Sequence, residues 1–229
     1  MRDTASLIRS MWTARADEVR EVIAFGERYV VDYIRARNAD PEQVFTTSRE
    51  DCALLYLLIR HFDRKRVFEI GTGIGTSAAC MYEALRRNGG ELVSSDPVDQ
   101  GAWTNSGLLF HGSATDALRL LRHDDYRPDF CFIDWPPDRD GLRLLGDALS
   151  ADCIIAVHDH NDCDPKGREV VAALQAAKIC WRGRWFLPSA DPDVMPDGTR
   201  INNCTAFWLS ETLLRARAHD VVNDPQQVL

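Results

Sequence analysis

A run of closely spaced glycines lies between a predicted strand and a predicted helix, and it constrains the fold more than any other segment. The segment VFEIGTGIGTSAACM, residues 67–81, places Gly71, Gly73 and Gly75 directly after apolar residues. Glycines at such a junction let the backbone approach a ligand closely, and the first turn of the following helix offers unpaired N–H donors. The segment therefore predicts a strand, a ligand-binding loop and a helix.

Short apolar runs alternate with helical patterns from residue 66 onward. The runs are RVFEI, ELVSS, LLFHG, DFCFID and CIIAVHD, and helices are expected from Thr76, from Ala114, near 139–149 and from Lys166. Buried strands that alternate with helices indicate a parallel sheet. The later runs RWFL and CTAFWL flank a loop rich in Pro, Asp and Asn and predict an antiparallel pair. We expect an α/β fold with a doubly wound, Rossmann-like, mostly parallel sheet and an antiparallel edge strand.

The chain has 229 residues, enough for one well-filled core, and we expect a single domain. We expect a helical cap at 1–45, a cofactor-binding core at 46–180, a strand pair at 181–210 and a tail at 211–229. Apolar residues at helical spacing over 5–37 predict one long helix, or two helices broken near Gly26. Ser48 begins a capping-box-like helix start with Asp51 in place of Glu.

Two classes of ligand fit a glycine-rich loop of this kind. A dinucleotide fingerprint requires Gly-x-Gly-x-x-Gly/Ala, and Thr76 stands in its last position. The other pattern is an acidic residue and one spacer before Gly-x-Gly-x-Gly, and Glu69 meets it. This second pattern resembles the first motif of class I S-adenosylmethionine-dependent methyltransferases. The resemblance implies a ligand that carries an ammonium and a sulfonium, which a carboxylate suits.

Later segments are similar to further motifs of that family. Asp96 ends the second strand, where the family's acid accepts the ribose hydroxyls, and LLFHGSATDAL resembles the third-strand turn that meets the adenine, with Asp116 as its acid. DFCFID resembles the fourth-strand motif and IIAVHD the fifth. The resemblance implies that S-adenosylmethionine contacts Glu69, Gly71, Thr72, Gly73, Gly75, Ser77, Asp96, Pro97, Gly112, Ser113, Ala114, Asp134 and Trp135.

The segment that leads into the glycine loop narrows the resemblance. Residues 44–71, VFTTSREDCALLYLLIRHFDRKRVFEIG, are similar to small-molecule O-methyltransferases of the catechol and caffeoyl-CoA type and to related bacterial natural-product enzymes. In that group a Thr/Ser segment lies near the cofactor, which implies this place for Thr46, Thr47 and Ser48. The resemblance implies O-methylation of a small molecule, and a planar acceptor could stack on Trp135.

The catechol-type enzymes hold a divalent cation, and the resemblance carries its ligands to Asp134, Asp159 and His160. Oxygen ligands suit Mg²⁺, and a histidine shifts the preference toward metals such as Mn²⁺. The sequence departs from the family at Pro137, where the family has a lysine near the acceptor hydroxyl. None of the three lysines of the chain lies near this position in the sequence, so we expect no lysine at the site. The candidates for the general base are His158, Asp159 and His160.

Several alternatives use the same residues. The string His158-Asp-His-Asn-Asp-Cys163 approaches the metal loop of metallo-β-lactamase-like hydrolases, but it leaves the glycine loop unexplained. Pro136 and Pro137 resemble the proline pair of amino-methyltransferases in the wrong order relative to Trp135. The chain could also cleave or cyclise S-adenosylmethionine, since the family lysine is missing, or could bind the cofactor without catalysis.

Charge and cysteine content exclude several other classes. The net charge of −8 argues against a general nucleic-acid binder. The longest strongly apolar run, Cys52–Ile59, is far shorter than the ~20 residues of a membrane span, and the first residues show no secretory signal pattern. Seven cysteines without a CxxC pair argue against a disulfide scaffold or a zinc knuckle. We therefore expect a cytoplasmic protein that has no nucleic-acid or membrane partner and forms a homodimer.

Overall fold

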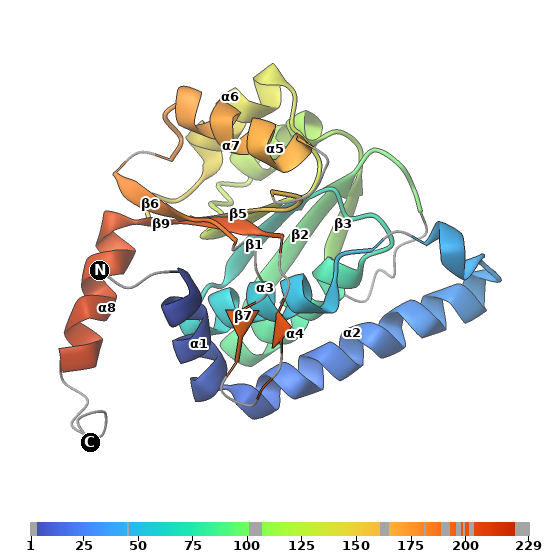
Figure 1. Ribbon diagram of the computed structural model, residues 1–229. Coiled ribbons are helices and arrows are strands. Elements are labelled where there is room, and N and C mark those ends of the chain that lie inside the picture. Colours follow the sequence, from blue (N-terminus) through green and yellow to red (C-terminus); the bar gives the residue numbers. More distant parts are fainter. Residues whose placement is uncertain are drawn as a thin grey trace.

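A seven-stranded sheet with helices on both faces forms the protein (Figure 1). The computed structural model describes residues 4–44, 46–100, 107–160, 165–180, 182–188, 193–195, 198, 200–201 and 204–222. Its elements are α1 (Thr4–Ala14), α2 (Ala16–Arg37), the 3-10 turn η1 (Pro41–Gln43), α3 (Arg49–His61), β1 (Arg66–Ile70), α4 (Thr76–Asn88), β2 (Glu91–Asp96), β3 (Leu108–His111), α5 (Ala114–His123), β4 (Phe130–Ile133), α6 (Arg139–Ala148), β5 (Ile154–Val157), α7 (Lys166–Ala176), β6 (Gly183–Phe186), β7 (Asp193–Val194), β8 (Arg200–Ile201), β9 (Ala206–Ser210) and α8 (Glu211–Val222).

The order of the strands in the sheet is β3-β2-β1-β4-β5-β9-β6. Strands β1 to β5 run parallel, and β9 is antiparallel to both β5 and β6. The α/β fold class and the antiparallel pair at one edge are therefore confirmed, with RWFL in β6 at the edge and AFWLS in β9 inside it. The pair β7 and β8 forms a separate short ladder.

Successive strands are added on one side of β1 and then on the other, and this change in strand order indicates where a ligand would bind. From β1 the chain proceeds to β2 and β3 on one side, and β4 and β5 lie on the other. Ligands of open α/β sheets bind at the carboxyl ends of the strands where the order reverses in this way. The backbone N–H of Gly71 donates to the Ser95 carbonyl oxygen at 2.8 Å, and the N–H of Asp134 donates to the Ile70 carbonyl oxygen at 2.8 Å. The ends of β1, β2 and β4 therefore lie side by side.

Two hydrophobic cores fill the two faces of the sheet. One contains α1 to α4, and the other contains α5, α6 and α7 (Figure 1). Helix α3 has nine consecutive buried residues, Asp51 to Ile59, because it lies between the sheet and the outer helix α2. This sandwiched position explains why its sequence is apolar all around rather than on one stripe. No described helix has the length and apolar character that would let it cross a membrane.

The N-terminal segment forms two helices, as one of the two predicted arrangements requires, but the predicted position of the break is wrong. The break falls at Arg15, whose φ of −141° is not helical, and Gly26 lies inside α2. Gly26 is buried where α2 packs on α4, and a Cβ there would lie 3.2 Å from the Cys80 Sγ. The glycine thus serves close packing between helices, which outweighs its low helix propensity.

Candidate functional site

The glycine loop follows β1 in a conformation that side chains other than glycine rarely adopt. The φ angles of Gly71, Gly73 and Gly75 are 87°, 55° and 91°. A Cβ on Gly71 would lie 2.9 Å from the Trp135 Cβ, so this glycine also permits β1 to approach the turn after β4. Helix α4 then begins after Gly75, which provides no side-chain cap. Its first turn therefore leaves N–H donors available to a ligand.

Asp96 at the end of β2 ties the glycine loop to the next loop of the sheet edge. Its Oδ2 accepts a hydrogen bond from the Gly73 N–H at 2.8 Å, and its Oδ1 accepts one from the Val98 N–H at 2.8 Å. The side chain also lines the cavity described below. Asp96 therefore fixes the shape of the loop and presents a carboxylate to whatever occupies the space beside it.

A cavity of about 710 Å³ lies at this edge of the sheet. Residues of the glycine loop and of the ends of β2, β4 and β5 form its floor, and Lys166 at the start of α7 closes one side. Its lining includes Tyr33 and, after α2, Ala39, Asp40, Gln43 and Val44, so the end of the predicted helical cap lines the cavity. The Tyr33 hydroxyl donates to the Gln100 carbonyl oxygen at 2.6 Å and joins this part of the lining to the loop after β2.

The hydroxyl of Thr76 is an unsatisfied polar group in the cavity wall. Thr76 is the first residue of α4 and is 5 % exposed, and its Oγ1 has no hydrogen-bond partner among the described residues. A buried hydroxyl without a partner is unfavourable unless a ligand or water satisfies it. The hydroxyl and the uncapped helix start thus fit a polar ligand in this cavity. Thr76 was not among the predicted contacts, although it adjoins the predicted Ser77.

Most of the predicted cofactor contacts line the cavity. Thr46 and Thr47 also line it, whereas Ser48 caps α3 by accepting from the Asp51 N–H. The predicted contacts that line it are Gly71, Thr72, Gly73, Ser77, Asp96, Pro97, Asp134 and Trp135. Those among the described residues that do not line it are Glu69, Gly75, Gly112, Ser113 and Ala114.

The third-strand turn has a structural role in the described part of the chain. Ser113 caps α5, where its Oγ accepts from the Asp116 N–H at 3.1 Å and donates to the Asp116 carboxylate at 2.7 Å. Asp116 also pairs with Arg119 at 3.0 Å on the surface. Asp116 does not line the cavity and belongs to the cap of α5, so its predicted adenine contact stays a prediction. Asn161 and Cys163 of the predicted metal loop lie outside the described residues.

Glu69 supports the glycine loop from below instead of facing the ligand space. Its carboxylate is fully buried and accepts hydrogen bonds from the Ser77 hydroxyl at 2.5 Å and the Ser94 hydroxyl at 2.7 Å. Burial raises the pKa of Glu69 to about 7, although these hydrogen bonds act in the opposite direction. The carboxylate thus connects α4 to β2 across β1, which explains an acid at this position without direct contact to a cationic ligand.

Replacing Glu69 with glutamine is expected to remove a pH dependence of stability. Between the unfolded pKa of 4.5 and the folded pKa of about 7, only the folded state keeps this proton. The wild type therefore loses stability as the pH rises through this window, by about 3 kcal/mol between about pH 5 and pH 8. Urea unfolding of both proteins at the two pH values measures the difference. Equal losses in the two proteins would contradict the assignment to Glu69.

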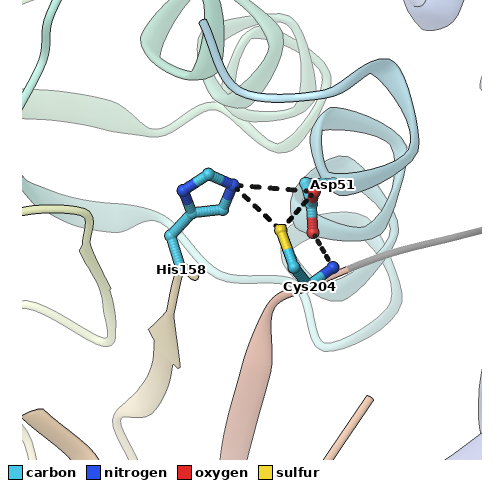
Figure 2. Close-up of side chains that lie close together, drawn as sticks. All are labelled: Asp51, His158 and Cys204. Carbon is cyan, nitrogen blue, oxygen red and sulfur yellow. Dashed lines mark hydrogen bonds and ion pairs between the residues drawn. The ribbon is translucent and has the colours of Figure 1, made fainter. Parts of the chain in front are cut away.

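His158 after β5 connects the cavity acids to a buried carboxylate. Its Nδ1 lies 2.8 Å from Asp134 Oδ1 and 3.1 Å from Asp159 Oδ1. Its Nε2 lies 3.4 Å from the Cys204 Sγ and 3.6 Å from Asp51 Oδ2 (Figure 2). Burial lowers the pKa of His158, but the hydrogen bonds with Asp134 and Asp51 outweigh burial and raise it well above its ordinary value. A protonated imidazole cannot accept a proton, so this geometry argues against His158 as the general base.

Asp51 lies behind His158 and was predicted only as part of a helix cap. It is fully buried at the start of α3, and its Oδ1 accepts from the N–H groups of Cys204 and Thr205 and from the Thr205 hydroxyl. Burial raises the pKa of Asp51, but the contacts with His158, Ser48 and Thr205 outweigh it and lower the pKa. The carboxylate therefore joins α3, His158 and the start of β9, three segments far apart in the sequence.

Lys166 corrects the expectation that no lysine lies at the site. Its Nζ lies 3.4 Å from Asp159 Oδ2 and 3.8 Å from Asp134 Oδ1, and it lies over the Trp135 ring at 5.1 Å from the centroid. The lysine is the first residue of α7, 29 positions after Pro137, where the family motif places a lysine. Lys166 is far from the fourth-strand motif in the sequence, so the motif did not indicate it. It lies beside Asp134 because α7 begins at the same edge of the sheet.

The described residues offer two groups of three side chains whose ligand atoms lie close enough for one metal ion. They are Asp51, His158 and Cys204, and Asp134, His158 and Asp159. His160 belongs to neither, and its backbone N–H donates to the Cys204 carbonyl oxygen at 2.8 Å. In the second group His158 is the hydrogen-bonded neighbour of Asp134, and the Lys166 ammonium lies beside both acids. The predicted divalent cation does not fit this donor set, because side-chain cations already neutralise the acids.

Comparisons with known proteins agree with the fold and with the predicted resemblance. No protein-family model matches the chain. Two curated proteins of Mycobacterium sp., strains KMS and MCS, each named "Putative O-methyltransferase", are 31% identical to it over 146 residues. The match covers 56% of this chain and 66% of each relative, just under two thirds of its length.

Solved structures with the same fold are known with ligands of the expected type. The O-methyltransferase of Bacillus cereus in complex with SAH has a TM-score of 0.58 at 17% identity and matches 80% of this chain and 91% of its own. The O-methyltransferase TomG of Streptomyces achromogenes in complex with SAM has a TM-score of 0.55 at 16% identity and matches 83% of this chain and 89% of its own. At such identities the likeness to these structures concerns the fold alone. Together with the named sequence relatives, it confirms the predicted resemblance to O-methyltransferases.

Proposed function

We infer that this chain, which has the fold of class I S-adenosylmethionine-dependent methyltransferases, transfers a methyl group from S-adenosylmethionine to a hydroxyl of a small molecule. One observation carries the proposal: the glycine loop and Asp96 share a single cavity with the acids Asp134 and Asp159. The names of the sequence relatives and the fold support the same chemistry.

The residues of the glycine loop would hold the methyl donor. S-adenosylmethionine supplies an electrophilic methyl group on a positively charged sulfur. Asp96 at the end of β2 is placed to accept hydrogen bonds from ribose hydroxyls, and the buried Thr76 hydroxyl can satisfy a polar group of the same ligand. The carboxylates of Asp96, Asp134 and Asp159 line the cavity together with His158 and Lys166. The two cations lie beside Asp134 and Asp159, so the charge of Asp96 is left to favour a cationic cofactor at the other end of the cavity.

Asp159 is the general base that the geometry supports. It lines the cavity, and burial followed by the nearby Asp134 charge raises its pKa, although His158 and Lys166 act against this. In the proposed reaction the acceptor oxygen bonds to the methyl carbon while the carbon–sulfur bond breaks, and the acceptor proton passes to the Asp159 carboxylate. S-adenosylhomocysteine is the second product. The exposed Trp135 ring at the mouth gives a planar acceptor a surface for stacking.

Product analysis tests the proposal most directly. The protein is incubated with S-adenosylmethionine and a panel of phenols and catechols, and the products are identified by mass. We expect S-adenosylhomocysteine together with an acceptor that is heavier by one methyl group. Methylthioadenosine would instead support cleavage or cyclisation, and cofactor binding without turnover on any acceptor would support a binding protein. Either outcome contradicts the proposed transfer.

The Asp159→Asn variant separates catalysis from binding. Loss of the base should lower kcat by about 100-fold, the usual range for general base catalysis, while the calorimetric affinity for S-adenosylmethionine changes little. An unchanged kcat would show that Asp159 is not the base.

The proposal includes a small-molecule acceptor and leaves out the divalent metal. The cytoplasmic location, the homodimer and the domain limits stay predictions.

A further inference from the structure

We propose that the Lys166 ammonium takes the place of a divalent metal beside Asp134 and Asp159, so that the methyl transfer requires no metal ion. The inference rests on the proposed function of the same cavity and specifies how that cavity treats the acceptor oxygen. It departs from the metal-dependent chemistry that the sequence resemblance implies for Asp134, Asp159 and His160.

The Lys166 ammonium lies beside both acids of the predicted metal site. It lies 3.4 Å from Asp159 Oδ2 and 3.8 Å from Asp134 Oδ1, so it contacts both acids that a metal would need. All three side chains line the cavity. The ammonium also lies over the Trp135 ring at 5.1 Å from its centroid, a second favourable interaction that holds it at the mouth.

The ring nitrogens of His158 already have partners and are not available as metal ligands. The Nδ1 of His158 is engaged with Asp134 Oδ1 at 2.8 Å, and Nε2 faces Asp51 and Cys204 on the other side of the ring. A metal ligand must offer a free lone pair, whereas both ring nitrogens of His158 already face carboxylates, Asp134 on one side and Asp51 on the other. The His158 imidazole and the Lys166 ammonium therefore compete with a dication for the same two acids, and of the two only the ammonium reaches them from a separate helix.

The backbone at the start of α7 and after β5 brings Lys166 to this position. Gly167 follows it, and a Cβ on Gly167 would lie 2.2 Å from the His158 carbonyl oxygen and 2.6 Å from the Asp159 backbone carbon. Only glycine therefore allows the first turn of α7 to lie against the turn after β5. Asp159 itself has a φ of 57°, which a residue other than glycine rarely adopts and which the surrounding structure must hold.

The chemical consequence concerns the acceptor oxygen. A cation beside that oxygen stabilises the negative charge that develops as its proton leaves for Asp159. A lysine ammonium provides this charge with three N–H donors on a flexible stem, so two can remain with the acids while one faces the acceptor. The proposed role of Lys166 is thus direct hydrogen bonding to the acceptor oxygen.

Manganese binding tests the proposal without knowledge of the acceptor. Wild-type protein, Lys166→Met and the control Lys65→Met are titrated with Mn²⁺ and followed by electron paramagnetic resonance. Lys65 is half-exposed and pairs only loosely with Asp63, at 3.7 Å. We expect no site-specific binding by the wild type or the control up to about 1 mM, the upper range of weak oxygen-ligand sites. Lys166→Met should bind at least about 10-fold more tightly than wild type, because it frees both acids.

Two results would overturn the proposal. Wild-type binding of Mn²⁺ that Asp159→Asn abolishes would show that the acids hold a metal in spite of Lys166. Failure of Lys166→Met to gain binding, with its fold verified by circular dichroism, would show that Lys166 is not what excludes the cation. Calorimetric titration of the wild type with S-adenosylmethionine keeps the two proposals separate, because absence of binding there contradicts the proposed function whatever the manganese result.

Discussion

Replacing Asp51 with alanine lowers the free energy of unfolding by about 3–5 kcal/mol, the range for removing one partner of a buried ionic network. The Asp51 carboxylate is fully buried and accepts three hydrogen bonds through Oδ1 alone, two from backbone N–H groups of residues 204 and 205. Its removal leaves those donors without their partner and leaves the His158 imidazolium with less compensating charge. Urea unfolding at neutral pH measures the effect.

A surface acid provides the matched control for this measurement. Asp147 lies on α6 with a side chain that is 55% exposed, and its carboxylate lies 4.0 Å from an Arg122 nitrogen. Asp147→Ala should change the free energy of unfolding by less than about 0.5 kcal/mol, as exposed ion pairs usually do. A loss below about 1 kcal/mol in Asp51→Ala would mean that the network does not hold α3 to β9 as described.

The second large effect concerns the cofactor. Asp96→Ala should weaken binding of S-adenosylmethionine by about 100-fold or more, which corresponds to about 3 kcal/mol. The variant loses the two hydrogen bonds that fix the Gly73 and Val98 backbone, and it loses the carboxylate that faces the ribose in the proposed complex. Calorimetric titration measures the affinity, and thermal unfolding verifies that the fold is intact.

Asp116→Ala is the control for the cofactor measurement. The sequence resemblance suggests an adenine contact for Asp116, whereas the structure places it in the α5 cap and in a surface pair with Arg119. Its replacement should leave the affinity for S-adenosylmethionine within about twofold, although it can lower helix stability by about 1 kcal/mol. An unchanged affinity in Asp96→Ala, or an equal loss in Asp116→Ala, would contradict the assignment.

The sequence determined the features that depend on local pattern. Apolar runs of four to six residues between helical segments determined the parallel strands, and Gly71 with its neighbours determined where the cavity forms. Both depend on backbone preferences and side-chain periodicity within a few residues, which a sequence displays directly. Asp96, Asp134 and Asp159 were found the same way, because each follows a strand and all parallel strands end at one edge.

The tertiary structure decided which charged side chains meet. Glu69 contacts two serines and does not line the cavity, and Asp51 is the buried partner of His158. Lys166, at the start of α7, lies beside the acids that follow β4 and β5. No local pattern indicates these contacts, since their partners are seven to more than a hundred residues apart and the distance between side chains depends on how whole elements pack. The sequence determined the α/β fold and the edge of the sheet where the cavity lies, and the packing of α3 and α7 decided the charge balance beside that cavity.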